Sequence, residues 1–434
     1  MTDETVSSDP AYLRRDVAAA QPAPITTRGP IAWVRQNLFS GWLSSILSVL
    51  SVLLLVWIVP DMFRFFVTNA VWSAPDGALC RAPGAGACWA FIERKIDFFR
   101  YGSYPESQHW RVDITLLFGA VLAARLLWPA ERKSPLGRLG FILGVPLLMF
   151  MLIPGPSAIA RDPEIELGIL ALGIGLAAVI EFTGMRTSLV ALLFFVVYPI
   201  FVVLMLHGSR TFGLVQIDTN LWGGIFVSLL VATIGIVVSL PFGVLLALGR
   251  RSRLPFVRFF SVVFIEFVRG VPLITVLFMA NTMLPLFVPD HLTPDRLLRP
   301  MIGVALFASA YMAEEIRGGL QAISKGQYEG AMALGLGYGQ MMRLVVLPQA
   351  LTLVIPGIVN IFIGLFKDTT LVAIVGVFDF LRTVDTARVD PAWSGPTISA
   401  TGYAFAAMFY FVFCFGMSRY SLMMERRLSA GRRH

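Results

Sequence analysis

Residues 329–348 read EGAMALGLGYGQMMRLVVLP, a segment of small residues between two strongly apolar runs. Residues 324–335 can form a short helix that stops at Gly335, because glycine readily adopts the conformation that follows a helix end. Residues 338–348 can form a second short helix. We expect Pro348 to end this helix, because proline lacks an amide hydrogen and clashes with the preceding turn.

The predicted hairpin is thin along its first helix. Gly330, Ala331 and Ala333 carry little or no side chain, so another protein's backbone can approach this helix closely. Such a hairpin either inserts into the groove of a partner protein or simply reverses the chain at a membrane surface. The residues themselves leave both interpretations open.

The composition places the chain in a membrane. Its 434 residues are 56% hydrophobic and 14% charged, whereas an average soluble domain is roughly 25% charged. Apolar runs of about 20 residues recur, which is the length that a helix needs to cross a bilayer. We predict an all-α polytopic membrane protein with about ten spans, at 42–60, 113–129, 138–155, 166–183, 187–206, 222–248, 257–288, 301–317, 351–377 and 400–419.

The positions of the cationic residues predict the orientation. They lie between the apolar runs, which argues against nucleic-acid binding despite a net charge of +8. If the N-terminus is cytosolic, the cytosolic segments hold 20 of the 35 lysines and arginines, as the positive-inside rule expects. We therefore predict that both termini lie in the cytosol.

The chain divides by composition into two membrane parts. The second part carries polar interruptions that resemble motifs, whereas the first has ordinary spans and one long polar loop. That loop contains Cys80 and Cys88, which either form a disulfide outside the cytosol or remain two free thiols. The predicted organisation is a flexible cytosolic tail (1–40), an N-terminal membrane extension (41–220) of about five spans with a large external loop (61–112), a functional core (221–425) with a cytosolic loop (318–350), and a basic cytosolic tail (426–434).

The seventh predicted span, 257–288, is too long for a plain crossing. Gly270 and Pro272 should kink it, because proline removes a helix hydrogen bond. Glu266 and Arg269 lie three residues apart on the same helix and predict a local ion pair.

Charged residues within a predicted span are costly and mark candidate functional positions. Lys367 and Asp368 lie about 25 Å along the ninth span, at about 1.5 Å per residue. They either line a translocation path or form an ion pair or polar contact that holds helices together. Thr369 and Thr370 follow them and can hydrogen-bond an ammonium or an amide group.

The segment 329–348 resembles the EAA loop of ABC-type importer permeases, in which Glu-Ala-Ala, a glycine four residues on and a terminal Leu-Pro recur at fixed spacing. Gly330 in place of alanine, and Val345 in place of isoleucine, are departures of similar size. In that family the loop inserts into a cleft of the ATPase subunit and transmits nucleotide-driven closure. The resemblance assigns this coupling role to Glu329, Gly330, Ala331, Gly335, Leu347 and Pro348.

Other motifs extend the resemblance across 221–425 to permeases for polar amino acids. The added spans and external loop are similar to those of the long permease subunits of bacterial glutamate, glutamine, aspartate and asparagine importers. This implies a permease subunit in the bacterial inner membrane, with two ABC ATPase subunits, a second identical or homologous permease, and a periplasmic amino-acid-binding protein. The motifs are FVRGVPLITVLF (267–278), AYMAEEIRGGLQAISKGQYEGA (310–331), LPQALTLVIPGIVN (347–360) and LFKDTTLVAIVG (365–376).

The sequence contains no recognisable nucleotide-binding, catalytic or metal-binding pattern. None of its four lysines sits in the Gly-Lys-Ser/Thr context that cradles phosphates, so we expect ATP-Mg to be used by the separate ATPase and this chain to bind no cofactor. We also expect no catalytic residues, because no nucleophile and base stand in a recognisable pattern, and no metal site, because the four histidines lack ligand spacing. The alternative function is an ion-coupled secondary amino-acid transporter with Lys367 and Asp368 as the coupling pair.

Overall fold

The computed structural model describes residues 29–127, 135–152, 162–209, 211 and 213–430, and they are predominantly helical. The predicted all-α fold is thereby confirmed. The helices are α1 (Pro30–Asn37), α2 (Trp42–Phe63), α3 (Trp89–Tyr101), α4 (His109–Leu127), α5 (Pro135–Leu139), α6 (Val145–Leu152), α8 (Pro163–Phe182), α9 (Thr187–Leu192), α10 (Tyr198–His207), α11 (Ile225–Arg250), α12 (Pro255–Gly270), α13 (Leu273–Phe278), α14 (Leu284–Phe287), α15 (Leu298–Ala322), α16 (Lys325–Ala333), α17 (Tyr338–Met341), α18 (Leu347–Leu353), α19 (Ile355–Asp368), α20 (Phe380–Ala387) and α21 (Ile398–Ala430).

Within the described residues, seven helices are long and apolar enough to cross a membrane, or eight if a bent pair is one crossing. Two further helices, α4 and α15, have 19 and 25 residues but carry more charged side chains. Together these helices are consistent with the ten predicted spans. The seven are Trp42–Thr68, Pro135–Leu152, Pro163–Phe182, Thr187–His207, Ile225–Arg250, Ile355–Val375 and Ile398–Arg426.

The bent pair occupies the predicted seventh span. Helix α12 ends at Gly270, α13 begins after Pro272, and the two helical arms, 255–270 and 273–287, meet at 109°. The second arm also contains a π-helical turn at Met279–Met283. The segment is therefore a broken span or a re-entrant loop, with a much sharper change of direction than a kink within one helix.

The chain separates into two compact units, Met1–Ala70 and Val71–His434. The first contains α1 and α2, and none of the side chains of α2 is buried. The predicted flexible tail is helical over Pro30–Asn37, because Pro30 occupies a first-turn position where a missing amide hydrogen costs nothing. Residues 1–28 lie outside the described residues.

The second unit is built around α11 and α15, which pack against each other along much of their length. One apolar cluster surrounds the first half of α11 and includes residues of α13, α19 and α10. Another surrounds the end of α11 and includes residues of α15, α16 and α18. Two β-strands of two residues each, β1 (Gly223–Gly224) and β2 (Phe378–Asp379), pair in parallel at the start of α11.

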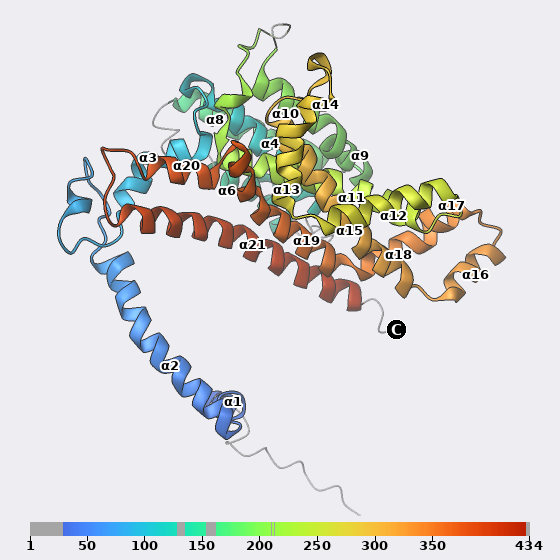
Figure 1. Cartoon of the computed structure of the whole chain (residues 1–434), viewed down its shortest axis with the longest axis horizontal. Helices are drawn as coiled ribbons and strands as arrows, with labels where there is room; N and C mark the ends of the chain where they lie inside the picture. Colours follow the sequence, from blue (N-terminus) through green and yellow to red (C-terminus); the bar gives the residue numbers. More distant parts are fainter. Residues whose placement is uncertain (1–28, 128–134, 153–161, 210, 212, 431–434) are drawn as a thin grey trace, which may run out of the picture. The chain divides into compact units, whose positions relative to one another are not determined.

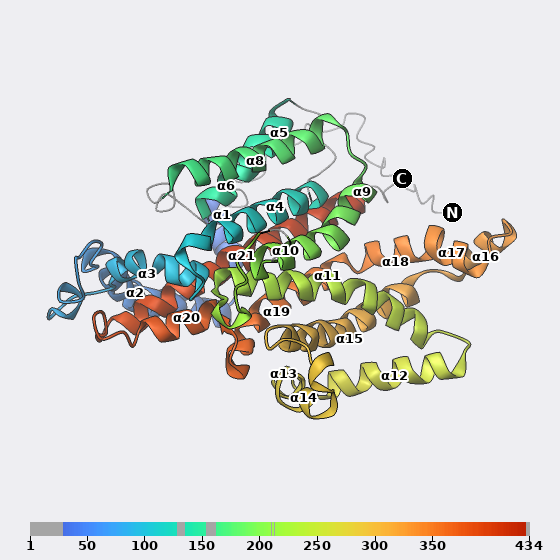
Figure 2. The same ribbon diagram turned by 90° about the horizontal axis from the view of Figure 1, so that it is seen from above.

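Two opposite ends of this unit carry different structures (Figures 1 and 2). Helices α3 and α20 lie at one end, which we call the cap face, and α16 and α17 lie at the other, which we call the hairpin face. The last helix, α21, continues to Ala430, so the start of the predicted basic tail 426–434 is helical; residues 431–434 lie outside the described residues.

Candidate functional site

The first arm of the hairpin face is α16. It ends as predicted at Gly335, whose φ of +72° is unfavourable for residues with a Cβ. The Gly335 amide donates to Met332 O over 2.9 Å, and the Leu336 amide donates to Ala331 O over 3.2 Å. These two bonds satisfy carbonyls at the helix end and turn the chain towards α17.

The second arm differs from the prediction that Pro348 ends it. Helix α17 runs into a π-helical turn at Met342–Val346 and then into α18, so Pro348 lies at the start of a continuing helix. The wider π turn removes the regular i→i−4 contact that a proline ring would otherwise strike. The prediction that this arm stops at Pro348 was wrong for that reason.

The inner side of the hairpin is held by the membrane helices. Ala331, Met341 and Val346 are buried in the same cluster as the end of α15. Arg251, just after α11, donates to Leu320 O and to the Tyr328 hydroxyl, both over 3.2 Å. The hairpin is therefore tied to both α11 and α15.

The outer side of the hairpin is apolar and exposed. The exposed fractions of Met332, Leu334, Tyr338 and Leu344 are 57%, 80%, 62% and 64%. For four glycines of the hairpin, an added Cβ would have no other atom of the chain within 4 Å beyond its immediate neighbours, so packing within the chain does not require a glycine there. They are Gly326, Gly330, Gly337 and Gly339. Together these features form a thin surface that a second protein can approach closely.

A cluster of charges lies beneath the hairpin, centred on Glu314 of α15. Arg250 of α11 contacts its Oε1 at 2.7 Å, Arg317 contacts its Oε2 at 2.8 Å, and Arg269 of α12 lies 3.6 Å from Oε2. The Glu314 side chain is only 14% exposed. Arg250 also contacts Glu266 of α12 at 2.8 Å. One carboxylate thus connects three helices.

The predicted local pair between Glu266 and Arg269 is not the one formed. Glu266 contacts Arg250, and Arg269 contacts Glu314 and lies over the Tyr311 ring at 5.6 Å. Spacing along one helix shows only which side chains are near each other. Stronger partners on α11 and α15 compete for both charges.

The candidate path residues lie where α19 ends and a 3-10 turn, Thr369–Val375, begins. Lys367 is exposed and Asp368 is half-buried. Neither has an ion-pair partner within 4.0 Å among the residues that the structure describes. Lys367 and Asp368 were predicted either to line a path or to hold helices together through an ion pair or polar contact, and the ion pair with another helix is not formed among the described residues.

The two threonines are positioned by their own helix. Thr369 is fully buried and donates to Phe366 O over 2.8 Å, and Thr370 donates to Lys367 O over 2.9 Å. These bonds leave the hydroxyl oxygens as acceptors. Thr370 thereby lies beside Lys367, whereas Thr369 belongs to the packed interior.

The exposed side of α19 carries one polar residue that was not predicted from the sequence. Asn360 is exposed, seven residues before Lys367, and Leu353 and Ile374 continue the same seven-residue spacing with exposed fractions of 38% and 49%. Within one helix, residues at this spacing share a face, so Asn360 and Lys367 lie on the same side of α19, whereas Leu353 ends α18 and Ile374 belongs to the following 3-10 turn. A Cβ at Gly364, between them, would meet nothing. The signal in the sequence was a polar pair at heptad spacing within an apolar run.

The cap face contains the long polar loop. Cys80 and Cys88 form a disulfide, which decides between the two alternatives for them. The Cys88 amide donates to Thr401 Oγ1 over 2.9 Å at the start of α21. Lys95 of α3 pairs with Asp390 at 2.5 Å and so lowers the pKa of that carboxyl, helped by the Ala392 amide.

The loop is also fixed to the start of α11. Gly224, at φ +79°, lies so close to α3 that an added Cβ would come within 2.8 Å of Arg100 backbone atoms. Gly102 bridges to Trp222. The loop is thus a folded cap joined to both α11 and α21.

Comparison with known proteins identifies relatives along the whole chain. The model of the family described as binding-protein-dependent transport system inner membrane component matches residues 239–430. The inner membrane amino-acid ABC transporter permease protein YhdY of Escherichia coli K12 is 42% identical over 412 residues, covering 95% of this chain and 96% of that one.

The glutamate/glutamine/aspartate/asparagine transport system permease protein BztC of Rhodobacter capsulatus is 42% identical over 441 residues, covering 98% of this chain and 100% of that one. A solved structure of an amino acid ABC transporter with histidines is 28% identical, covers 47% of this chain and 92% of its own, and has a TM-score of 0.41. The resemblance found in the motifs is confirmed by these full-length relatives.

Proposed function

The chain belongs to the binding-protein-dependent inner membrane transport components, as an amino-acid ABC transporter permease, and on this premise we propose that it imports glutamate, glutamine, aspartate and asparagine. The observation that carries the substrate proposal is the match with BztC, which extends over all of that protein, N-terminal spans included. ATP is hydrolysed by a separate subunit. The permease moves substrate by alternating access and makes or breaks no covalent bond.

The hairpin face is the docking surface for the ATPase in this proposal. Its exposed apolar side chains suit a groove, and its glycines allow a neighbouring backbone to approach. Glu329 is exposed on the same helix, α16. The hairpin then lies in the cytosol with both chain termini, as the distribution of lysine and arginine supports. Two ATPase copies would serve two permeases.

The exposed face of α19 supports a second permease subunit and a path between the two. Exposing a lysine to lipid at membrane depth costs about 2.5–3.5 kcal/mol, so Lys367 requires a polar or aqueous neighbour. A paired permease, identical or homologous, would cover Leu353 and Ile374 and leave a polar lane along Asn360 and Lys367. The Lys367 ammonium would attract a substrate carboxylate there.

The cap face lies on the periplasmic side in this orientation, where a binding protein delivers the amino acid. The disulfide between Cys80 and Cys88 suits that oxidising compartment. Because the cap is joined to α11 and α21, a binding protein that docks on it would contact helices of the transport core. We assign the cap this docking role.

The test is radiolabelled uptake into proteoliposomes that contain the permease, its ATPase and its binding protein. Leu334→Asp should abolish ATP-driven uptake of all four amino acids without lowering the melting temperature, because this side chain is 80% exposed. Leu136→Asp is the matched control, since Leu136 is 82% exposed in α5, outside both the hairpin face and the cap face. Full uptake by Leu334→Asp would contradict docking at the hairpin. Uptake that persists without ATP and stops when an ion gradient is removed would identify a secondary transporter instead.

A further inference from the structure

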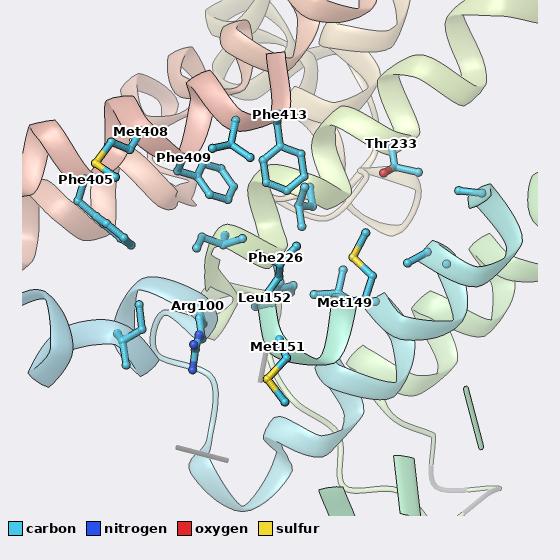
Figure 3. Close-up of a pocket in the computed structure, with 18 of the residues that line it drawn as sticks. Arg100, Met149, Met151, Leu152, Phe226, Thr233, Phe405, Met408, Phe409 and Phe413 are labelled. Atoms are coloured by element: carbon cyan, nitrogen blue, oxygen red, sulfur yellow. The ribbon is translucent and has the colours of Figure 1, made fainter. Parts of the chain in front are cut away.

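A cavity of about 530 Å³ lies between the N-terminal membrane helices and the C-terminal ones of the unit 71–434 (Figure 3). Its walls come from α4, α6, α10, α11 and α21 and from the π-helical turn Leu193–Val197, and Ile96 and Arg100 of α3 also line it. Of the described residues that line it, Arg100 alone is charged, and nearly all the others are apolar. The coupling hairpin and the α19 face contribute nothing to it.

The cavity exists because small residues face aromatic ones. Ala120 and Ala123 lie on one face of α4, and their short side chains leave space beside them. Phe405, Phe409 and Phe413 line it from α21, each one helical turn after the last. Among the described lining residues, Tyr198 and Thr233 also carry hydroxyl groups, and the Tyr198 hydroxyl donates to Thr115 O over 3.0 Å; apart from these and Arg100 the wall is apolar.

The depth of the cavity matches one leaflet of a bilayer. Along α11 it extends from Ile225 to Thr233, and along α21 from Phe405 to Phe413, which is about 12 Å in each case at 1.5 Å per residue. The hydrocarbon core of a bilayer is about 30 Å thick, so one leaflet is about 15 Å. The cavity thus runs from the cap face to near the middle of the membrane.

Arg100 lies at the level where a lipid headgroup would be. Its backbone packs against Gly224, directly before the first turn of α11, and its guanidinium contacts Asp97 at 3.5 Å. A guanidinium has five N–H donors and suits a phosphate group. The charged group at the rim and the apolar interior together have the polarity of a single phospholipid.

The geometry points to a phospholipid site, in which one acyl chain fills the cavity and the phosphate of an anionic headgroup contacts Arg100. A protein helix is about 10–12 Å wide with its side chains. An acyl chain is narrower and matches both the apolar wall and the depth of one leaflet. The bound lipid joins the N-terminal helices to the transport core.

The test uses the full chain purified as its complex and exposed to phosphatidylglycerol or phosphatidylethanolamine, with retained lipid counted by native mass spectrometry. We expect one firmly retained phospholipid per chain, with phosphatidylglycerol preferred about fivefold, the effect of roughly one cationic residue near a headgroup. Ala120→Phe should lower retention about tenfold, because displacing even two methylene groups has that effect. Arg100→Gln should abolish the preference for phosphatidylglycerol and keep the acyl chain bound.

The controls are Ala171→Phe, an exposed alanine of α8, and Arg94→Gln, an exposed cation of α3, neither of which lines the cavity. Both should behave as the unmodified chain. If Ala120→Phe does not fold, Leu229→Trp fills the cavity from α11 and replaces it. Unchanged retention in a folded cavity-filling variant, or no retained lipid in the unmodified complex, would overturn the proposal. Equal loss of headgroup preference in Arg94→Gln would refute the role of Arg100.

Discussion

Removing the charge of Glu314 tests whether the cluster beneath the hairpin holds α11, α12 and α15 together. The change is Glu314→Gln, which keeps the size of the side chain and one hydrogen-bond acceptor. It leaves Arg317 and Arg269 without their carboxylate, and Arg250 with only the exposed partner Glu266.

The magnitude follows from burial. Removing one partner of a buried ion pair costs about 3–5 kcal/mol, and the Glu314 side chain is only 14% exposed. We expect a loss near the lower limit, about 3 kcal/mol, because Gln still accepts one hydrogen bond. The control is Glu266→Gln: Glu266 is 54% exposed and contacts Arg250, so the expected loss is below about 1 kcal/mol.

The assay is the melting temperature of the purified complex in detergent, with ATP-driven uptake as a second measurement. A loss of about 3 kcal/mol should lower the melting temperature by several degrees, and uptake should fall because the hairpin loses its support. Glu266→Gln should leave both near normal. Equal shifts for the two variants, or none for Glu314→Gln, would refute the conclusion that this carboxylate organises the three helices.

Three further predictions concern the path and the cap face. Lys367→Met should impair glutamate and aspartate uptake at least as much as glutamine and asparagine uptake, measured with saturating binding protein. It should not lower the melting temperature, because no ion pair within the described chain is lost. Normal uptake of all four amino acids would remove Lys367 from the path. Replacing both Cys80 and Cys88 by alanine should cost about 2.5 kcal/mol, from the entropy of a closed loop of this length, because the separation is eight residues, and an unchanged melting temperature in oxidising buffer would contradict this. Asp379 is fully buried, and burial raises its pKa to about 7. The folded state therefore binds an extra proton between about pH 4 and pH 7, and the stability of the fold falls as pH rises through that window. Between pH 6 and pH 8 the loss should be about 1.4 kcal/mol, and Asp379→Asn should remove this part of the pH dependence, as comparison of the two melting curves will show.

The helices and the first arm of the hairpin could be predicted because their causes are local. Apolar runs of membrane length determine the spans, and Gly335 determines where α16 stops. The end of the second arm was mispredicted because the helix passes through Pro348 by way of a π-helical turn, whose buried residues pack in the same cluster as the end of α15. A local rule about proline does not include that packing.

The contacts between distant segments were beyond local reasoning. Glu266 and Arg269 are neighbours on α12, but their partners Arg250 and Glu314 come from α11 and α15, which only the fold brings together. The disulfide was one of two alternatives for the same reason. Two cysteines eight residues apart are close in any compact loop, but the loop must fold before their side chains can meet.

Glu314 lies between the hairpin, where the ATPase is proposed to dock, and the helices that lead to the proposed translocation path. Helix α15 has 25 residues and is therefore about 37 Å long; it leads from the cap side to the hairpin, and Glu314 lies eight residues before its end. A displacement of the hairpin moves this end of α15, and through Arg250 and Arg269 it must move α11 and α12 or break their ion pairs. Packed helices with charged contacts shift between discrete arrangements and do not bend continuously. In the proposed function, ATP-driven movement at the hairpin face would thereby pass to α11, which packs against α19, the helix that carries Lys367.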